Sequence, residues 1–181
     1  MVRRSTRFFA AALAFACVAA CAPPPSSTAM VPDVAAAGAG RAPAATYRNA
    51  ITVGSITLGR DTATPWASAV APDQVREALV QTLASAQLGQ AAGGRFRLDA
   101  TLLTLDRPYA GFAMTVTAAI AWRLTEAATG RVVYDKTLTA IGTATLDDAV
   151  ENNNRLRIAD QRAVRANLQQ LVQDLYALPA R

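Results

Sequence analysis

The chain has 181 residues, 52% of them apolar and 17% charged, which is typical of a globular protein and excludes an intrinsically disordered one. Its net charge of +5 falls to about +2 once the three arginines among the first seven residues are set aside, so the sequence does not predict a nucleic-acid-binding protein. A chain of this length is enough for one domain with a sizeable core.

Residues 1–20 have the three parts of a removable secretory signal. Three arginines open the segment, an apolar run covers residues 8–18, and small residues follow. The run is too short for a good transmembrane helix, which needs about 20 apolar residues. We therefore expect cleavage at the end of this segment.

The sequence Val18-Ala19-Ala20-Cys21 resembles the lipobox of bacterial lipoproteins, in which an aliphatic residue and two small residues precede a cysteine. The resemblance implies cleavage before Cys21, transfer of diacylglycerol to its thiol and acylation of the new amino group, with no other cofactor. Two or three acyl chains hold a protein stably on a membrane. The alternative is an ordinary secretory signal with an incidental cysteine. Cys17 is the weaker site, because a bulky phenylalanine stands close before it.

The residues after Cys21 bear on which membrane holds the protein. In enterobacterial lipoproteins, an Asp directly after the lipidated cysteine favours retention in the inner membrane. Ala22 and Pro23 stand here instead. By that resemblance we expect the periplasmic face of the outer membrane, with the periplasmic face of the inner membrane as the alternative.

The composition divides the remaining chain into two parts. Residues 21–46 hold the lipidated cysteine and a run rich in Pro and Ala, which predicts a flexible tether about 25–30 Å from end to end. Residues 47–181 are predicted to form a single α+β domain.

The domain begins with a strand and a helix. Apolar residues alternate over residues 51–58, with a slip in phase at Gly54-Ser55 that predicts a bulge. Spacings of three and four predict a helix over residues 72–88, with Gly89 as its C-terminal cap.

Three strands and a helix follow. Alternation predicts strands over residues 96–102, 114–124 and 131–142, with Trp122 on the apolar face of the second. A long amphipathic helix is expected over residues 152–178. The order strand, helix, strand, strand, strand, helix predicts a two-layer α+β fold, an antiparallel sheet of about four strands with two helices on one face.

The residue types exclude several kinds of catalysis. The sequence has no His, and no free Cys remains after processing, so Ser–His and Cys–His mechanisms are excluded. Lys136 is the only Lys and has no matching Ser motif, and no glycine-rich phosphate loop is present. We expect a protein that is not an enzyme.

Acidic residues offer two further possibilities. Asp147, Asp148, Glu151 and residues 152–154 supply oxygen ligands for a hard cation, but their spacing is not that of an EF-hand. A polar loop whose asparagines cap the last helix is the favoured interpretation, so no metal is expected. A carboxylate pair for glycoside hydrolysis would come from Asp99, Asp106 and Asp135, although exposed strand positions explain these residues equally well.

Two loop aromatics and three arginines are candidate contact residues. Trp66 and Tyr109 each stand beside a proline in a predicted loop, where they contact a partner or anchor the loop. Arg155, Arg162 and Arg165 share one face of the last helix, where they meet anionic lipid or simply face water. The small residues Thr115, Thr117, Ala119 and Ala121 are predicted to form a flat sheet face that receives a partner or faces water.

From residue 51 to residue 178 the domain resembles small periplasmic α/β lipoproteins, namely the lipopolysaccharide-assembly lipoprotein and the auxiliary lipoproteins of ABC-type lipid transport. The lipobox, the tether, the helix from Pro72, the turn Ala127-Ala128-Thr129-Gly130-Arg131 and the long last helix carry this resemblance. It implies a non-catalytic accessory or scaffold lipoprotein that binds a protein partner in the envelope. A periplasmic lipid- or glycan-binding module is the alternative. The sequence leaves the oligomeric state open.

Overall fold

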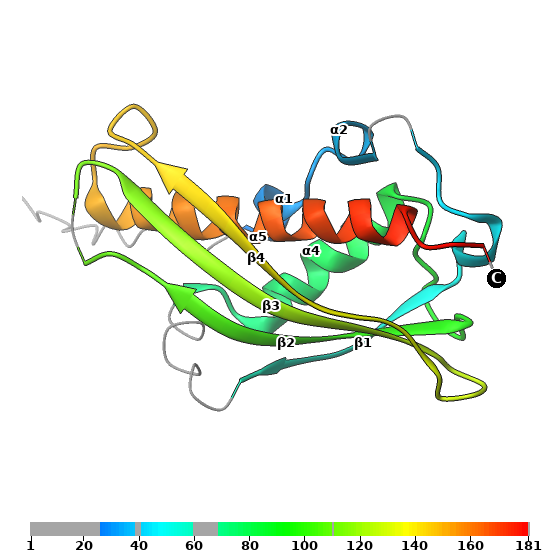
Figure 1. Ribbon diagram of the computed structural model, residues 1–181. Coiled ribbons are helices and arrows are strands. Elements are labelled where there is room, and N and C mark those ends of the chain that lie inside the picture. The colour runs from blue at the N-terminus through cyan, green and yellow to red at the C-terminus, as the bar shows by residue number, and fades with distance from the viewer. Residues whose placement is uncertain (1–25, 39–40, 60–68, 110, 181) are drawn as a thin grey trace, which may run out of the picture.

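The computed structural model describes residues 26–38, 41–59, 69–109 and 111–180. A four-stranded sheet forms one layer, and two helices lie on one of its faces (Figure 1). This confirms the α+β fold class and the predicted order of elements. In chain order the main elements are β1 (Ile51–Leu58), α4 (Pro72–Ser85), β2 (Phe96–Asp106), β3 (Met114–Glu126), β4 (Val132–Ala144) and α5 (Asn152–Tyr176).

The sheet has the strand order β1-β2-β3-β4. The pairs β2–β3 and β3–β4 are antiparallel as expected, but β1 pairs with β2 in parallel, so the prediction of a fully antiparallel sheet was wrong. The reason is α4, which carries the chain back across the sheet so that both strands start at the same end. The register between β1 and β2 shifts between Val53 and Ile56, which confirms the predicted bulge.

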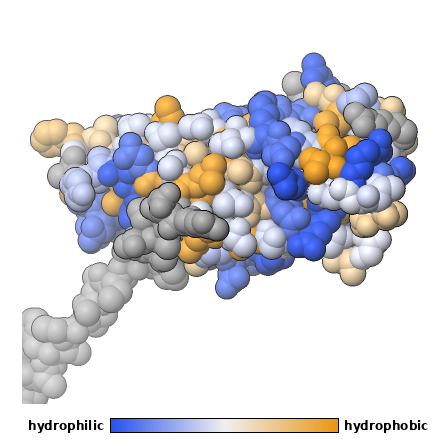
Figure 2. Space-filling view, turned by 60° about the horizontal axis from the view of Figure 1, so that its bottom comes forward, coloured by the Kyte–Doolittle hydropathy of each residue, from blue (hydrophilic) through white to orange (hydrophobic). Residues whose placement is uncertain are grey.

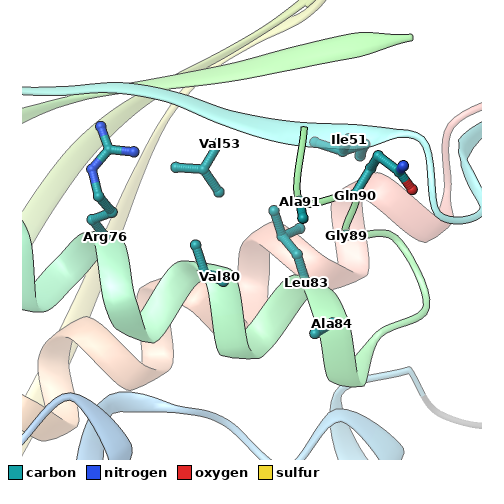
Figure 3. A pocket seen from close by; sticks show the side chains of 9 residues that line it. All are labelled: Ile51, Val53, Arg76, Val80, Leu83, Ala84, Gly89, Gln90 and Ala91. Atoms are coloured by element: carbon teal, nitrogen blue, oxygen red, sulfur yellow. The ribbon is translucent and has the colours of Figure 1, made fainter. Parts of the chain in front are cut away.

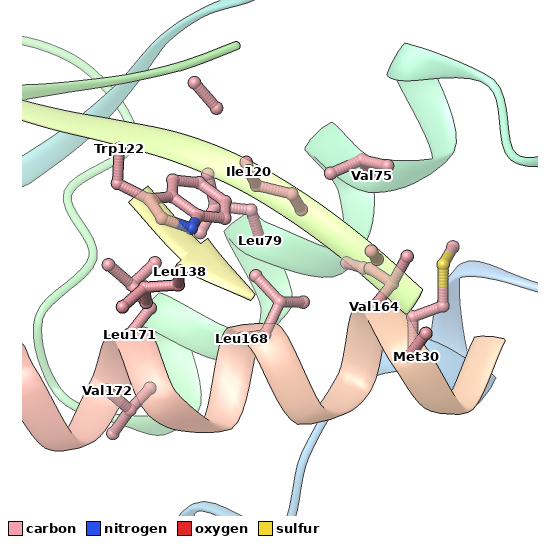
Figure 4. Packing of buried hydrophobic residues seen from close by; sticks show 14 of the residues in the cluster. Met30, Val75, Leu79, Ile120, Trp122, Leu138, Val164, Leu168, Leu171 and Val172 are labelled. Carbon is pink, nitrogen blue, oxygen red and sulfur yellow. The ribbon is translucent and has the colours of Figure 1, made fainter. Parts of the chain in front are cut away.

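The core lies between the sheet and the two helices. Along β3 every second side chain, from Met114 to Glu126, is buried, and Trp122 is fully buried as predicted. Figure 4 shows Trp122 facing the apolar side of α5. The indole Nε1 donates a hydrogen bond of 2.9 Å to Asn167 Oδ1, and Asn167 Nδ2 donates to the carbonyl oxygens of Ala118 and Leu138. A buried amide on α5 thus joins the helix to both β3 and β4.

The strand β4 approaches α5 unusually closely at Gly142. A Cβ at this position would lie 2.2 Å from Ala159 O and 2.2 Å from Ala163 N, both of them backbone atoms of α5. Only glycine fits there, because a methyl group would overlap the helix backbone.

The end of α4 differs from the prediction. Gln87, and not Gly89, takes the left-handed backbone conformation, with φ of 56°. The amides of Leu88 and Gly89 both donate to Leu83 O and so satisfy a free carbonyl of the last turn. Gly89 is needed for space, since a Cβ there would lie 3.0 Å from Ala84 N.

Part of the segment that was predicted to be a flexible tether is folded. The helices α1 (Ser27–Met30) and α2 (Val34–Gly38) pack on α5, and the 3-10 helix η1 (Ala45–Tyr47) follows. Met30 and Tyr47 are fully buried in the core cluster, and the Tyr47 ring lies 4.9 Å from that of Phe96. Apolar side chains scattered among the small residues give this segment enough surface to bury.

Within the described ranges, no helix combines the length and the hydrophobicity needed to cross a bilayer. Residues 1–25, which include the signal and the lipobox, lie outside the described residues, as does Trp66.

Candidate functional site

Two loops form an apolar surface at one end of the molecule. Residues 107–113 join β2 to β3 and residues 145–151 join β4 to α5, and both loops lie at the left of Figure 1. Figure 2 shows hydrophobic residues at this end among polar ones, with further hydrophobic residues elsewhere on the same face. We call this surface the apolar tip and define it by four exposed residues: Tyr109 (101% exposed), Phe112 (82%), Leu146 (45%) and Val150 (86%).

Arg155, in the first turn of α5, holds the two loops together. Its Nη2 donates to Gly111 O at 3.1 Å, and its Nη1 donates to Ala149 O at 3.0 Å and to Val150 O. The prediction that Arg155 faces lipid or water was wrong, since the residue is only 6% exposed. Its guanidinium is buried because the loop carbonyls, together with Asn152 Oδ1, satisfy both Nη atoms.

A second contact fixes the same loop. Arg107 in the loop from β2 to β3 donates to Asp160 Oδ2 on α5 at 3.1 Å. The carboxylate is almost fully buried, and this burial raises the pKa of Asp160 to about 6, against the lowering effect of Arg107. Two arginines therefore attach the tip to the first turns of α5, so the apolar side chains project from a fixed base.

The other two arginines of the predicted stripe also bind groups of this chain. Arg162 forms a two-pronged ion pair with Asp148, at 2.6 and 2.8 Å, and donates to Thr143 O. Arg165 donates to Ala29 O in α1. The three arginines consequently do not act as one free basic surface. Tyr109 alone among the described candidates stands fully in water, at the apolar tip.

The acidic segment at the start of α5 is occupied by its own contacts. The pKa of Asp148 is lowered to about 2, mainly by the hydrogen bonds from Arg162 and also by the Thr145 amide. Glu151 is the N-cap residue, without a capping bond from its side chain, and it accepts from Asn154 Nδ2. The prediction that asparagines cap this helix was wrong. No group of three potential metal-ligating side chains occurs in the described part of the chain.

Two of the three acids considered for glycoside hydrolysis, Asp99 and Asp135, pair with arginines, and Asp106 is exposed at the end of β2. Burial raises the pKa of Asp99, but hydrogen bonds from Ser55 and Arg97 outweigh it and leave the pKa below its usual value. Asp135 accepts two hydrogen bonds from Arg123, at 2.7 and 3.0 Å. A glycosidase needs one carboxylic acid with a raised pKa, which is the opposite of the state of Asp99.

The sheet face turned away from α4 and α5 presents small side chains. Along β3 and β4 the outward residues alternate with buried ones, as predicted for β3. Ile141 is 62% exposed in the middle of this surface. We call it the open sheet face and define it by Thr115, Thr117, Ala119, Ala121, Thr139, Ile141 and Thr143.

A groove of about 380 Å³ lies between β1 and α4. Figure 3 shows Val53 and Val80 along its walls, with Arg76 at one end and Gln90 at the other. The Arg76 guanidinium donates to Gly54 O, the carbonyl at the β1 bulge. Tyr109 does not line this groove.

Sequence reasoning found Tyr109 but missed Phe112, Leu146 and Val150. The available signal was three large apolar residues in two segments predicted to be loops. Nothing in the spacing showed that these segments meet, because Arg155 brings them together through backbone carbonyls, which carry no sequence signature.

No family model matches the sequence, and no curated protein matches it. In structure the chain is similar to PelC from Paraburkholderia phytofirmans, which forms a dodecamer, with 17% identity over 76% of this chain and 94% of PelC and a TM-score of 0.53. It is also similar to a DUF330 family protein from Xanthomonas campestris (15% identity, 75% and 87% coverage, TM-score 0.48) and to a minor lipoprotein from Acinetobacter baumannii (16%, 72% and 92%, 0.45). The likeness to PelC shows a shared fold and does not extend to activity.

Proposed function

We propose that this protein is an envelope lipoprotein that works without catalysis, as an accessory or scaffold subunit that binds a protein partner. Lipid on Cys21 holds it at the periplasmic face of the outer membrane. The system it serves is one of envelope transport or assembly, of the kind that uses lipopolysaccharide-assembly or ABC-transport auxiliary lipoproteins. The lipobox and the resemblance of the domain support this assignment.

The open sheet face is the observation that carries the proposal. Most of its side chains are short, so a partner can approach the backbone of β3 and β4 at little cost in side-chain entropy. Exposed Ile141 adds an apolar anchor at its centre.

The groove between β1 and α4 favours the second candidate, a lipid- or glycan-binding module. Its walls are apolar and a cation stands at one end, which suits a ligand with an apolar body and an anionic group. The side chains closest to this role are Val53, Val80 and Arg76.

Site-specific photocrosslinking in intact cells separates the two candidates. A photoreactive residue replaces Thr117 or Thr139 on the open sheet face, Val80 in the groove, or, as the control, exposed Glu77 on α4. We expect one discrete protein adduct from Thr117 and Thr139 and none from Glu77.

The mass of each adduct decides the outcome. A lipid or glycan adduct from Val80, with no protein adduct from the open sheet face, would replace the scaffold function by the binding module. An adduct of twice the monomer mass would show that a second copy of this chain covers the face.

A further inference from the structure

The path of the chain before the domain bears on the apolar tip. Ser26 is the first described residue, and α1 follows it directly. Ala29 O accepts a hydrogen bond from Arg165, near the middle of α5, and Gly38 lies against Tyr176 at the far end of the same helix. The segment from Ser26 to Gly38 therefore runs along α5 away from the apolar tip, so Ser26 lies at the end of this segment that is nearer the tip (Figure 1).

Only a short length of chain separates this entry point from the lipid. Cys21 precedes Ser26 by five residues, which span at most about 17 Å when fully extended. Along α5, the distance from Arg165 to the first residue, Asn152, is about 20 Å at the helical rise per residue. The lipid on Cys21 therefore lies within about 17 Å of Ser26. Because α1 is docked on α5, this short stretch keeps the domain close to the membrane surface.

The exposed apolar residues are concentrated at that end. The described residues include seven exposed large hydrophobic side chains, and four of them form the apolar tip. At the opposite end, by the turn between β3 and β4, Val132 is exposed by 45%. Aromatic and aliphatic side chains of this kind settle at the boundary between headgroups and acyl chains.

The charges near the tip indicate which lipid it meets. Asp147 and Glu151 are exposed beside Leu146 and Val150, and neither forms an ion pair with an arginine of the described residues. Anionic headgroups would be repelled by these carboxylates, so the tip suits a surface of zwitterionic phospholipid.

We propose that the apolar tip enters the headgroup–acyl boundary of the membrane that holds Cys21, as a second contact beside the lipid anchor. This inference rests on the lipid anchor of the proposed function. The tip fixes how the domain is oriented, whereas the anchor fixes only where it is. The lipid that the tip contacts is zwitterionic phospholipid.

Fluorescence of the lipidated protein in vesicles tests this inference. Cleavage of the signal peptide removes Cys17, and the lipid blocks the thiol of Cys21. An introduced cysteine is then the only free thiol to label. An environment-sensitive fluorophore is attached at Phe112→Cys or, on the other loop, Val150→Cys. The matched control is Thr129→Cys in the turn at the opposite end. The vesicles are phosphatidylcholine with a spin label placed near the headgroup.

We expect a blue-shifted emission and quenching at least about fivefold stronger for the probes at positions 112 and 150 than for the probe at 129, since quenching acts only within the bilayer. Replacing part of the lipid by anionic phosphatidylglycerol should not increase the quenching. Equal, water-like signals from all three positions on protein that floats with the vesicles would overturn the inference and leave the anchor intact. Protein that does not float at all would refute the anchor and the tip contact together.

If a protein and not lipid covers the tip, the fluorescence gives a different result. If the probe at position 112 stays in water on pure lipid and becomes shielded only in native envelope membranes, a protein covers the tip and the inference is wrong.

Discussion

Asp160 is the acidic side chain whose burial has the clearest consequence for stability. Its pKa is raised to about 6 because burial outweighs the effect of Arg107, whereas an Asp in an unfolded chain titrates near 3.9. The folded state therefore binds the proton more tightly than the unfolded state. The contribution of Asp160 to stability is complete below pH 4 and is lost as the pH rises through 6.

We predict that Asp160→Asn removes this loss. The free energy of unfolding of the wild type, relative to that of the variant, should fall by about 2 kcal/mol between pH 4 and pH 7, which is most of what a shift of two pKa units implies. Urea unfolding at both pH values measures it. The carboxylates with lowered pKa, such as Asp148, are present in both proteins and cancel in the difference. A difference that does not change with pH would contradict the assigned pKa.

The hydrogen bonds of Arg155 lead to a prediction about local opening of the two tip loops. Arg155→Met keeps much of the side-chain volume but removes the bonds to the carbonyls of Gly111, Ala149 and Val150. Bonds from a charged donor contribute about 1.5–3 kcal/mol each, so amide hydrogen exchange in both tip loops should accelerate by at least about tenfold. Arg157→Met on the same helix is the control, because Arg157 bonds only to Gln161 among the recorded hydrogen bonds. Equal exchange in the two variants would show that Arg155 does not hold the tip.

At the scale of elements, the contact of β4 with α5 depends on one glycine. We predict that Gly142→Ala lowers the free energy of unfolding by about 3 kcal/mol, the upper part of the range for overpacking, because the added methyl meets backbone atoms that cannot rotate away. Thr143→Ala, the neighbouring position on the open sheet face, should cost less than about 0.5 kcal/mol. Denaturation in urea compares the two. Similar losses would mean that α5 shifts easily away from β4.

The elements themselves were largely predictable from the sequence. Alternation along β3 and the spacing of apolar residues along α5 reflect burial on one side, and burial governs where these elements form. The parallel pairing of β1 with β2 was not predicted, because alternation is the same in both kinds of sheet. The docking of α1 was missed because one buried side chain, Met30, is too little to form a pattern.

The candidate site was less predictable than the fold. On a helical wheel Arg155 lies on the polar side of α5, where a side chain is expected to face solvent. In the structure the two loops fold over it and bury it. Loop conformation depends on contacts distant in sequence, and single-sequence periodicity does not report them. Tyr109 was found because an aromatic beside a proline stands out, whereas Val150 resembles any other apolar residue.

For the whole molecule, the proposed lipid anchor and the proposed membrane contact of the apolar tip would together define an orientation. β2 ends at the tip and β3 begins there, so with the tip on the membrane the strands run up from its surface (Figure 1). The open sheet face then looks sideways, along the membrane plane. A partner embedded in the same membrane or standing on it meets this face directly, which links the proposed partner site to the proposed lipid contact.

This orientation depends on lipid at Cys21, which leads to a prediction for the intact cell. Cys21→Ser should abolish incorporation of labelled palmitate and release the protein from the membrane fraction, because serine offers no thiol for diacylglycerol transfer. Cys17→Ser is the matched control and should leave both properties unchanged, since that residue departs with the signal. Membrane fractionation with palmitate labelling measures both variants. Labelled, membrane-bound Cys21→Ser protein would place the lipid elsewhere. The five-residue limit on the distance between lipid and domain would then fail, and the orientation derived from it would fail as well.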